Sequence, residues 1–359
     1  MRAILVGIDF GQVAFQASFS ELSLLAISAG SMPVAEVIAK RQRPDPALFI
    51  GRGKADELKV AVLVHAIELV IFNHNLSPVQ QRNLERLLKI HVLDRTGLIL
   101  DIFAQRAHSH IGKTQVELAR VQYQASRLVR AWSHLERQKG GIGLRGGPGE
   151  SQMELDRRML DARAKRLRID LDKLCKQQAT QRRARERRGA FKISLVGYTN
   201  SGKSTLFNAL TKAKTYAADQ LFATLDTTSR RLYLEESCSV ILSDTVGFIR
   251  DLPHQLVAAF RATLDETVHA DLLLHVVDVA SEQREQQIAQ VNQVLTEVAA
   301  MQIPQLLVMN KIDLLSTSMC DPRIEYDDVG FPARVFISAR DNTGLDLLRQ
   351  ALAEIAKKK

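Results

Sequence analysis

Gly197-Tyr198-Thr199-Asn200-Ser201-Gly202-Lys203-Ser204 is the stretch of sequence that decides the fold. It has the spacing of a phosphate-binding loop, in which glycines allow consecutive backbone N–H groups to surround a β-phosphate. The lysine supplies a positive charge to the β- and γ-phosphates, and the final serine offers a hydroxyl to Mg²⁺. The apolar run 191–196 before the loop predicts a buried strand, and residues 204–210 predict a helix. This context favours nucleotide binding over a chance match.

Two further segments carry groups for Mg²⁺ and the γ-phosphate. Asp244-Thr245-Val246-Gly247 follows the apolar run 240–243, so the carboxylate can hold the water shell of Mg²⁺ and the glycine N–H can meet the γ-phosphate. Phe222-Ala223-Thr224-Leu225-Asp226 stands in the expected position of an effector loop. We predict Thr224 as the second Mg²⁺ ligand beside Ser204, with Thr227 and Thr228 as alternatives and a simple turn as another. The predicted catalytic residues are Lys203, Thr224 and Gly247.

A second pair of segments indicates which base is bound. Asn310-Lys311-Ile312-Asp313 follows the apolar run 305–309. A carboxylate there accepts from guanine N1–H and the 2-amino group, which adenine cannot satisfy, at a cost to adenine nucleotides of roughly several kcal/mol. Ser338-Ala339-Arg340 is predicted to close over the base through its backbone, although a strand-ending turn would also fit the position. We therefore predict GTP or GDP with Mg²⁺ as ligands.

The residue after Gly247 limits the expected turnover. Phe248 cannot orient or polarise an attacking water, which some GTPases do with a glutamine at this position. We expect slow hydrolysis by the free protein and activation by a partner or an ordered loop.

Composition indicates an ordinary soluble protein. Of its 359 residues, 46% are hydrophobic and 25% charged. No apolar stretch is long enough to cross a bilayer, and the N-terminus lacks a secretion-signal profile. Cys175, Cys238 and Cys320 have no metal-ligand spacing, so we expect reduced thiols and a cytoplasmic location.

The charge is unevenly distributed. The net charge is +9, and basic residues crowd the segment from Arg157 to Arg188 with few acids between them. A charge run on a helix is usually its solvated face. Here the excess of one sign favours contact with nucleic acid and predicts sensitivity to salt.

Periodicity predicts three parts within an α/β fold. Residues 1–112 alternate strand and helix patterns, which is typical of a small α/β domain, and residues 191–356 form the nucleotide domain, with a mostly parallel sheet and helices on both faces. Residues 113–188 predict a long antiparallel helical hairpin, with helices of roughly 25 residues. Its apolar seam repeats at spacings of three and four: Leu118, Val121, Ala125, Leu128, Trp132 and Leu135, then Leu160, Ala164, Leu167, Leu171 and Leu174.

The turn of this hairpin is unusually long. Residues 140–149 are rich in glycine, which disfavours helix, whereas two or three residues would reverse the chain. We favour a tip that contacts a partner, and a merely flexible turn is the alternative. For Trp132, packing in the seam is favoured over a platform for stacking bases.

Several motifs together resemble the HflX family of ribosome-associated GTPases over essentially the whole chain. They are 50–54 (IGRGK), 72–78 (FNHNLSP), 92–97 (VLDRTG), 100–103 (LDIF), the glycine-rich 140–150 and 244–253 (DTVGFIRDLP). Two positions depart from the family's common pattern: Thr227 stands where a proline usually follows the aspartate, and Arg340 where lysine is commoner. Because the sequence ends at Lys359, we also expect a short form without the further C-terminal domain that many members have.

The resemblance implies the partner. Family members bind the large (50S) ribosomal subunit, with the hairpin and its tip near the peptidyl-transferase region of ribosomal RNA, and the ribosome stimulates their GTP hydrolysis. The expected function is therefore a monomeric GTPase that splits or rescues stalled ribosomes, or aids ribosome biogenesis. The alternative is a nucleotide-gated RNA-binding module in which hydrolysis is incidental. A tRNA-modifying or membrane-traffic GTPase fits less well, since no lipidation signal is present.

Overall fold

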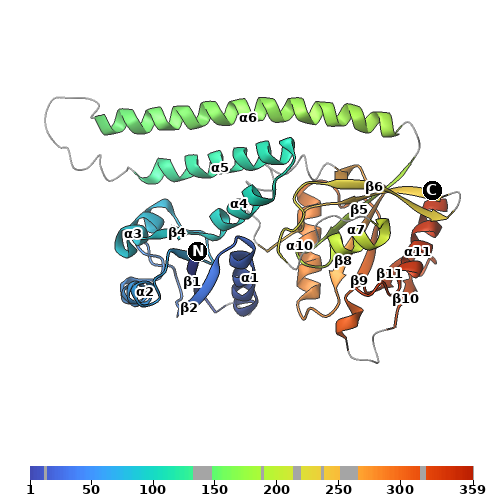
Figure 1. The fold of residues 1–359 in the computed structure, drawn as a ribbon, viewed down its shortest axis with the longest axis horizontal. Helices are drawn as coiled ribbons and strands as arrows, with labels where there is room; N and C mark the ends of the chain where they lie inside the picture. Colours follow the sequence, from blue (N-terminus) through green and yellow to red (C-terminus); the bar gives the residue numbers. More distant parts are fainter. Residues whose placement is uncertain are drawn as a thin grey trace. The chain divides into compact units, whose positions relative to one another are not determined.

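The computed structural model describes residues 1–11, 14–131, 148–186, 190–212, 220–235, 238–250, 266–315 and 321–358. The fold is α/β, as the sequence predicts, and the chain divides into two compact units (Figure 1). The first unit comprises Met1–Gln105 and Lys113–Asp172, and the second comprises Arg106–Gly112 and Lys173–Lys359. Each unit contains its own sheet.

The sheet of the first unit has four parallel strands in the order β2-β1-β3-β4. Helix α1 packs against β1 and β2, whereas α2 and α3 pack against each other. The core between the sheet and α2 and α3 includes Ile4, Phe72, Leu58 and Leu84. The elements are β1 (Arg2–Asp9), α1 (Phe15–Ser28), β2 (Met32–Lys40), α2 (Arg52–Val64), β3 (Leu69–Phe72), α3 (Pro78–Leu88), β4 (His91–Leu93) and α4 (Arg95–Arg106).

Two helix starts in this unit have clear local causes. Ser77 caps α3: its hydroxyl accepts from the backbone N–H of Gln80, whose side chain accepts from the Ser77 N–H in return. Helix α4 was not among the elements expected from the sequence. Most residues of its first two turns are buried, so the helix lacks a periodic polar face. The helix start is stabilised by Asp94, whose carboxylate accepts from the Gly97 N–H at 2.8 Å.

The predicted hairpin consists of α5 (His110–Ala131) and α6 (Pro148–Glu186). Its seam is confirmed where Leu118 and Val121 pack against Ala164 and its neighbours Leu160, Leu167 and Leu171. Helix α6 has 39 residues, against the roughly 25 predicted, and it begins at Pro148, inside the expected tip. Proline is favoured in the first turn of a helix, where its missing N–H costs nothing. Trp132, Leu135 and residues 140–147 lie outside the described residues.

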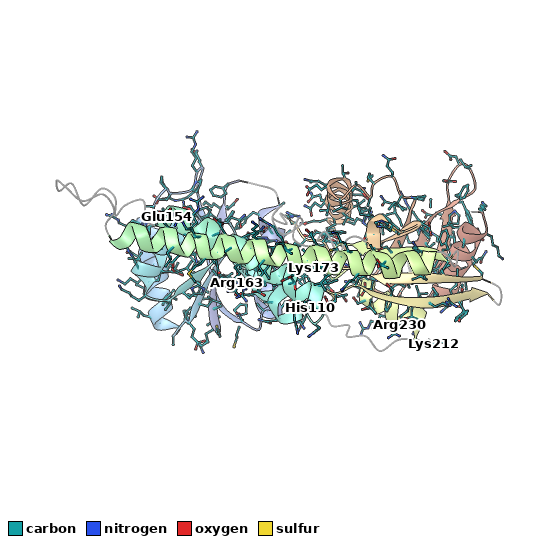
Figure 2. The ribbon with its side chains drawn as sticks, turned by 90° about the horizontal axis from the view of Figure 1, so that it is seen from above. His110, Glu154, Arg163, Lys173, Lys212 and Arg230 are labelled. Carbon is teal, nitrogen blue, oxygen red and sulfur yellow. The ribbon has the colours of Figure 1, made fainter. Side chains whose placement is uncertain are left out.

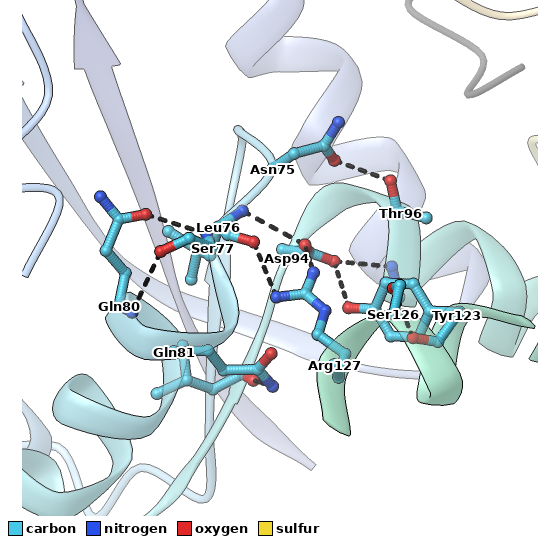
Figure 3. A network of polar contacts seen from close by, with 12 residues as sticks. Asn75, Leu76, Ser77, Gln80, Gln81, Asp94, Thr96, Tyr123, Ser126 and Arg127 are labelled. Atoms are coloured by element: carbon cyan, nitrogen blue, oxygen red, sulfur yellow. Dashed lines mark hydrogen bonds and ion pairs between the residues drawn. The ribbon is translucent and has the colours of Figure 1, made fainter. Parts of the chain in front are cut away.

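A buried carboxylate fastens α5 to the sheet of the first unit (Figure 3). Asp94 is fully buried and accepts from the Tyr123 hydroxyl at 2.7 Å, from Arg127 and from the Leu76 N–H at 3.2 Å. Arg127 also donates to the Leu76 carbonyl at 2.7 Å. Burial and the neighbouring Asp94 charge raise the pKa of Tyr123, so its hydroxyl stays protonated and donating.

The sheet of the second unit has seven strands in the order β10-β11-β9-β8-β5-β7-β6. The inner pairs are parallel, and the two edge pairs, β10 with β11 and β6 with β7, are antiparallel. The strands are β5 (Phe191–Gly197), β6 (Thr228–Glu235), β7 (Cys238–Asp244), β8 (Leu272–Asp278), β9 (Gln305–Asn310), β10 (Arg323–Tyr326) and β11 (Pro332–Phe336). The short edge strand β10 was not predicted.

Helices cover both faces of this sheet, as predicted. Helices α7 (Lys203–Thr211) and α11 (Leu345–Lys357) bury Phe207 and Leu348 in the main core on one face. Helix α10 (Arg284–Glu297) places Ile288 against Val277 and Met309, which alternate to the other face. Strand β5 lies between β7 and β8, so the chain changes direction across the sheet there, and ligands of parallel α/β sheets bind at the carboxyl end of such a strand.

Candidate nucleotide-binding site

The phosphate loop begins at the carboxyl end of β5 and ends in the first turn of α7. Both of its glycines are needed by the geometry. Gly197 has φ +147° and a Cβ there would lie 2.3 Å from the Val276 carbonyl oxygen. Gly202 has φ +95° and a Cβ would lie 2.2 Å from Asn310 Nδ2. The loop therefore packs directly against the neighbouring strands, with its N–H groups at the start of a helix.

Lys203 is a buried cation within this loop. Its side chain donates to the carbonyls of Gly197 at 3.1 Å and Tyr198 at 2.7 Å, and the residue is only 5% exposed. Burial lowers the pKa of Lys203 to about 8, and the Asp244 charge opposes this shift. A Cβ on Gly247 would lie 2.9 Å from Lys203 Nζ, so the backbone of Gly247 lies beside the charge. An anion at this place would relieve the cost of burying the ammonium.

Three oxygen-bearing side chains meet beside the lysine. Ser204 Oγ lies 2.6 Å from Thr224 Oγ1 and donates to Asp244 Oδ2 at 2.7 Å, and Thr224 Oγ1 donates to the same carboxylate oxygen at 3.0 Å. Thr228, an alternative to Thr224, lies instead in strand β6. Burial raises the pKa of Asp244, against the hydrogen bonds from Ser204 and Thr224 that lower it.

This cluster fits Mg²⁺. Adjacent oxygen ligands of octahedral Mg²⁺ are about 3 Å apart, which is close to the spacing here. The other carboxylate oxygen, Asp244 Oδ1, is buried and has no hydrogen-bond partner within the part of the chain that the structure describes. A buried carboxylate oxygen with no donor is costly, and a bound cation or its water would satisfy it. Ser204 and Thr224 would hold the metal directly, and Asp244 would hold its water.

Asn310 joins the parts of the site that recognise phosphate and base. Its Nδ2 donates to the Ser201 carbonyl at 2.8 Å, and its Oδ1 accepts from the Ala339 N–H at 2.9 Å. The predicted base loop 338–340 is thereby tied to the phosphate loop. Lys311 forms an ion pair with Asp278 at 2.8 Å.

Recognition of guanine by Asp313 stays a prediction, and the structure gives the position of this residue. It lies in the short 3₁₀ helix Ile312–Leu314 that follows β9. Its Oδ1 atom is buried, and no described residue forms a hydrogen bond with it. An unpartnered acceptor after strand β9 matches the donors on the edge of guanine.

Phe248 has a structural place in the site. Its ring is buried, and its backbone pairs with the start of the phosphate loop: its N–H donates to the Gly197 carbonyl at 3.1 Å, and its carbonyl accepts from the Thr199 N–H at 2.6 Å. The side chain therefore cannot act on water at the γ-phosphate, in line with the expected slow turnover. The adjacent Gly247 is held over the loop by the same pairing.

The structure brings most of the predicted phosphate-side residues around one cavity. Its lining residues are Thr199, Asn200, Gly202, Lys203, Ser204, Thr205, Gln220, Phe222, Ala223, Thr224, Thr245 and Gly247. Thr205 and Gln220 were not predicted; Thr205 directly follows the motif, whereas nothing in the sequence marks Gln220. Ser201, Leu225 and Val246 are buried nearby, Arg340 is exposed, and Asp226 points its carboxylate at the segment 108–112.

Comparison with known proteins agrees with this geometry. Family profiles match residues 16–104 (GTP-binding GTPase N-terminal), 106–185 (GTP-binding GTPase middle region) and 192–311 (50S ribosome-binding GTPase). GTPase HflX of Escherichia coli K12 is 52% identical over 353 residues, which are 98% of this chain and 82% of that protein. The chain belongs to the HflX family of GTPases. It is thus a GTP-binding enzyme that hydrolyses GTP.

Other HflX relatives extend the agreement. GTPase HflX of Caldanaerobacter subterraneus is 45% identical over 351 residues, covering 98% of this chain and 79% of that protein. Among solved structures, a GTP-binding protein from Sulfolobus solfataricus in complex with GDP matches with a TM-score of 0.53 and 25% identity, covering 100% of this chain and 99% of that chain. Within the described part of the chain, no helix is both long and apolar enough to cross a membrane.

Proposed function

We propose that this HflX protein is a Mg²⁺-dependent GTPase that acts on the large (50S) ribosomal subunit in the cytoplasm, as a monomer, to split or rescue stalled ribosomes or to aid their biogenesis. The observation that carries the GTP-dependent part is the meeting of Ser204, Thr224 and Asp244 beside the buried Lys203. The match to a profile of 50S ribosome-binding GTPases supports the partner.

The proposed chemistry is electrostatic. A water attacks the γ-phosphoryl group in line, and the bond to the β-phosphate oxygen breaks. The backbone of Gly247 lies beside the Lys203 ammonium. In the proposed reaction the ammonium and the Gly247 N–H stabilise the negative charge that develops on the transferring group. Ser204 and Thr224 would hold Mg²⁺, which would supply positive charge to the phosphate groups. Because Phe248 is buried, the orientation of the water is left to the partner.

The basic face of α6 supports contact with RNA. Four of its exposed cations, Lys165, Arg166, Arg168 and Lys176, form no ion pair within the described residues. By contrast, Arg163 donates to Glu117, and Arg157 and Arg158 pair with acids of their own helix. Figure 2 shows Arg163 and Lys173 along this helix. Unpaired surface cations are the groups that neutralise phosphates and release counterions.

Sedimentation of ribosomes with a non-hydrolysable GTP analogue tests the proposal. We expect the protein to migrate with the large subunit when the analogue is present and to stay unbound with GDP. Lys203→Ala should abolish the effect. A triple variant, Lys165, Arg166 and Arg168→Glu, should lose binding. A control with the same charge change away from α6, in and between β2 and α2, should keep it: Lys40, Arg43 and Lys59→Glu.

The buried Phe248 also favours one alternative, a nucleotide-gated RNA-binding module whose hydrolysis is incidental. Single-turnover assays separate the two: the enzyme reading requires ribosomes to accelerate GTP hydrolysis by orders of magnitude. Ribosome binding without acceleration would favour the module.

A further inference from the structure

Asp226 belongs to the predicted effector loop, but its carboxylate forms hydrogen bonds with another segment of the second unit, residues 108–109. It accepts from the backbone N–H groups of His108 at 2.8 Å and Ser109 at 2.7 Å, and from the Ser109 hydroxyl. Three donors occupy its two oxygens. Asp226 is therefore committed to the segment 108–109 and does not line the phosphate cavity.

The segment that Asp226 holds is the start of helix α5. Ser109 Oγ also accepts from the Gly112 N–H at 2.9 Å, so Ser109 caps this helix while it donates to Asp226. A Cβ on Gly112 would lie 2.2 Å from Asp226 Oδ1, so a side chain at that position would displace the carboxylate. At the other end of the loop, Arg106 donates to Gln220, which lines the phosphate cavity. The loop 220–226 is thus fastened to residues 106–112 at both ends.

Asp226, which these hydrogen bonds hold, is close in sequence to Thr224, a predicted Mg²⁺ ligand. Only Leu225, whose side chain is buried, separates Asp226 from Thr224. Two residues span at most about 7 Å, so the place of Asp226 restricts where the Thr224 hydroxyl can lie. That hydroxyl contacts both Ser204 and Asp244. Because these contacts order the loop before nucleotide binds, the loop loses less conformational entropy on binding.

We infer that Asp226 and Ser109 form a positioning pair, which holds Thr224 on the Mg²⁺ cluster and ties the nucleotide site to the first turn of α5. The inference rests on the proposed role of Thr224. Later turns of the same helix are fastened by Asp94 through Tyr123 and Arg127. A change at Thr224 that releases Asp226 would therefore act on a helix that continues into the hairpin.

The test compares nucleotides in the full-length protein without ribosomes. The variants are Asp226→Ala, Ser109→Ala and Ser109→Thr, and the matched control is Asp327→Asn, an exposed carboxylate that accepts from the N–H groups of Val329 and Phe331. We expect Asp226→Ala and Ser109→Ala to weaken binding of a GTP analogue about tenfold, the size of a typical coupling between sites, and to raise the Mg²⁺ concentration required. GDP binding should change by less than about twofold, because ordering of this loop depends on the γ-phosphate.

A second measurement does not depend on nucleotide. Hydrogen exchange of the unliganded protein should become faster in residues 106–112 and 220–226 of the Asp226→Ala variant, and stay unchanged in the control. Ser109→Thr keeps the hydroxyl and should restore both readouts. Equal losses for GDP and the GTP analogue, with a lowered melting temperature, would overturn the inference in favour of a merely structural role, as would no change at all. Since ribosomes are absent, failure of ribosome binding leaves this result untouched.

Discussion

Replacing Asp313 with asparagine should change which purine the site accepts. The substitution keeps the size of the side chain and one oxygen, but places an NH₂ group where the carboxylate had a second acceptor. In the structure, Asp313 Oδ1 is buried and has no hydrogen-bond partner among the described residues, so it could accept from the base. Guanine N1–H and its 2-amino group would each donate to the carboxylate.

The size of the effect follows from these two hydrogen bonds. A hydrogen bond to a charged group contributes about 1.5–3 kcal/mol. The amide keeps one acceptor and loses the other, so the loss of one bond corresponds to about 10- to 150-fold weaker GDP binding. Xanthine has a carbonyl oxygen at C2 in place of the amino group. The new amide can donate to it, so xanthosine nucleotides should bind the Asp313→Asn variant better than guanosine nucleotides.

Competition against a fluorescent GDP analogue measures both affinities. Asp341→Asn, an exposed aspartate just beyond the base loop 338–340, is the matched control and should leave GDP affinity unchanged. If Asp313→Asn bound GDP within about threefold of the original protein, or gained nothing for xanthosine diphosphate, Asp313 would not be the guanine-recognising residue.

Three further predictions concern packing and burial. Gly202→Ala should reduce GDP binding by at least about tenfold, because the added Cβ would lie 2.2 Å from Asn310 Nδ2; equilibrium titration checks this, and full binding would contradict it. Asp94→Asn should lower the free energy of unfolding by about 3–5 kcal/mol, since it leaves Arg127 without its buried partner; urea denaturation should show an earlier transition in the first unit. Burial lowers the pKa of His275 to about 4. Between about pH 6.5 and pH 4 the unfolded chain therefore binds a proton that the folded chain does not. As the pH is lowered through this window, the free energy of unfolding should decrease by up to about 3 kcal/mol. His275→Asn should flatten this slope, and an unchanged slope would place the titration elsewhere.

Local motifs made much of the nucleotide site predictable. The phosphate loop, Asp244 and Asn310 are found by spacing alone, because their chemistry needs particular residue types at fixed distances along a strand, turn and helix. The seam of the hairpin was predictable for a similar reason, since helical periodicity places Leu118 and Ala164 on apolar faces. Helix α4 was not, because burial on nearly all sides removes that periodicity.

The sequence by itself determined that this chain binds a guanine nucleotide through an α/β phosphate loop. Each motif is a short segment, and its residues act together with their neighbours in the sequence. Only the tertiary structure decided that Asp226 holds the start of α5 rather than the ligand, and that Asn310 ties the base loop to the phosphate loop. Asp226 and Ser109 are 117 positions apart in the chain, and Asn310 and Ser201 are 109 apart. The sequence around an aspartate or a serine does not indicate so distant a partner. The three-dimensional path of the chain supplies that partner, and with it the physical role of the side chain.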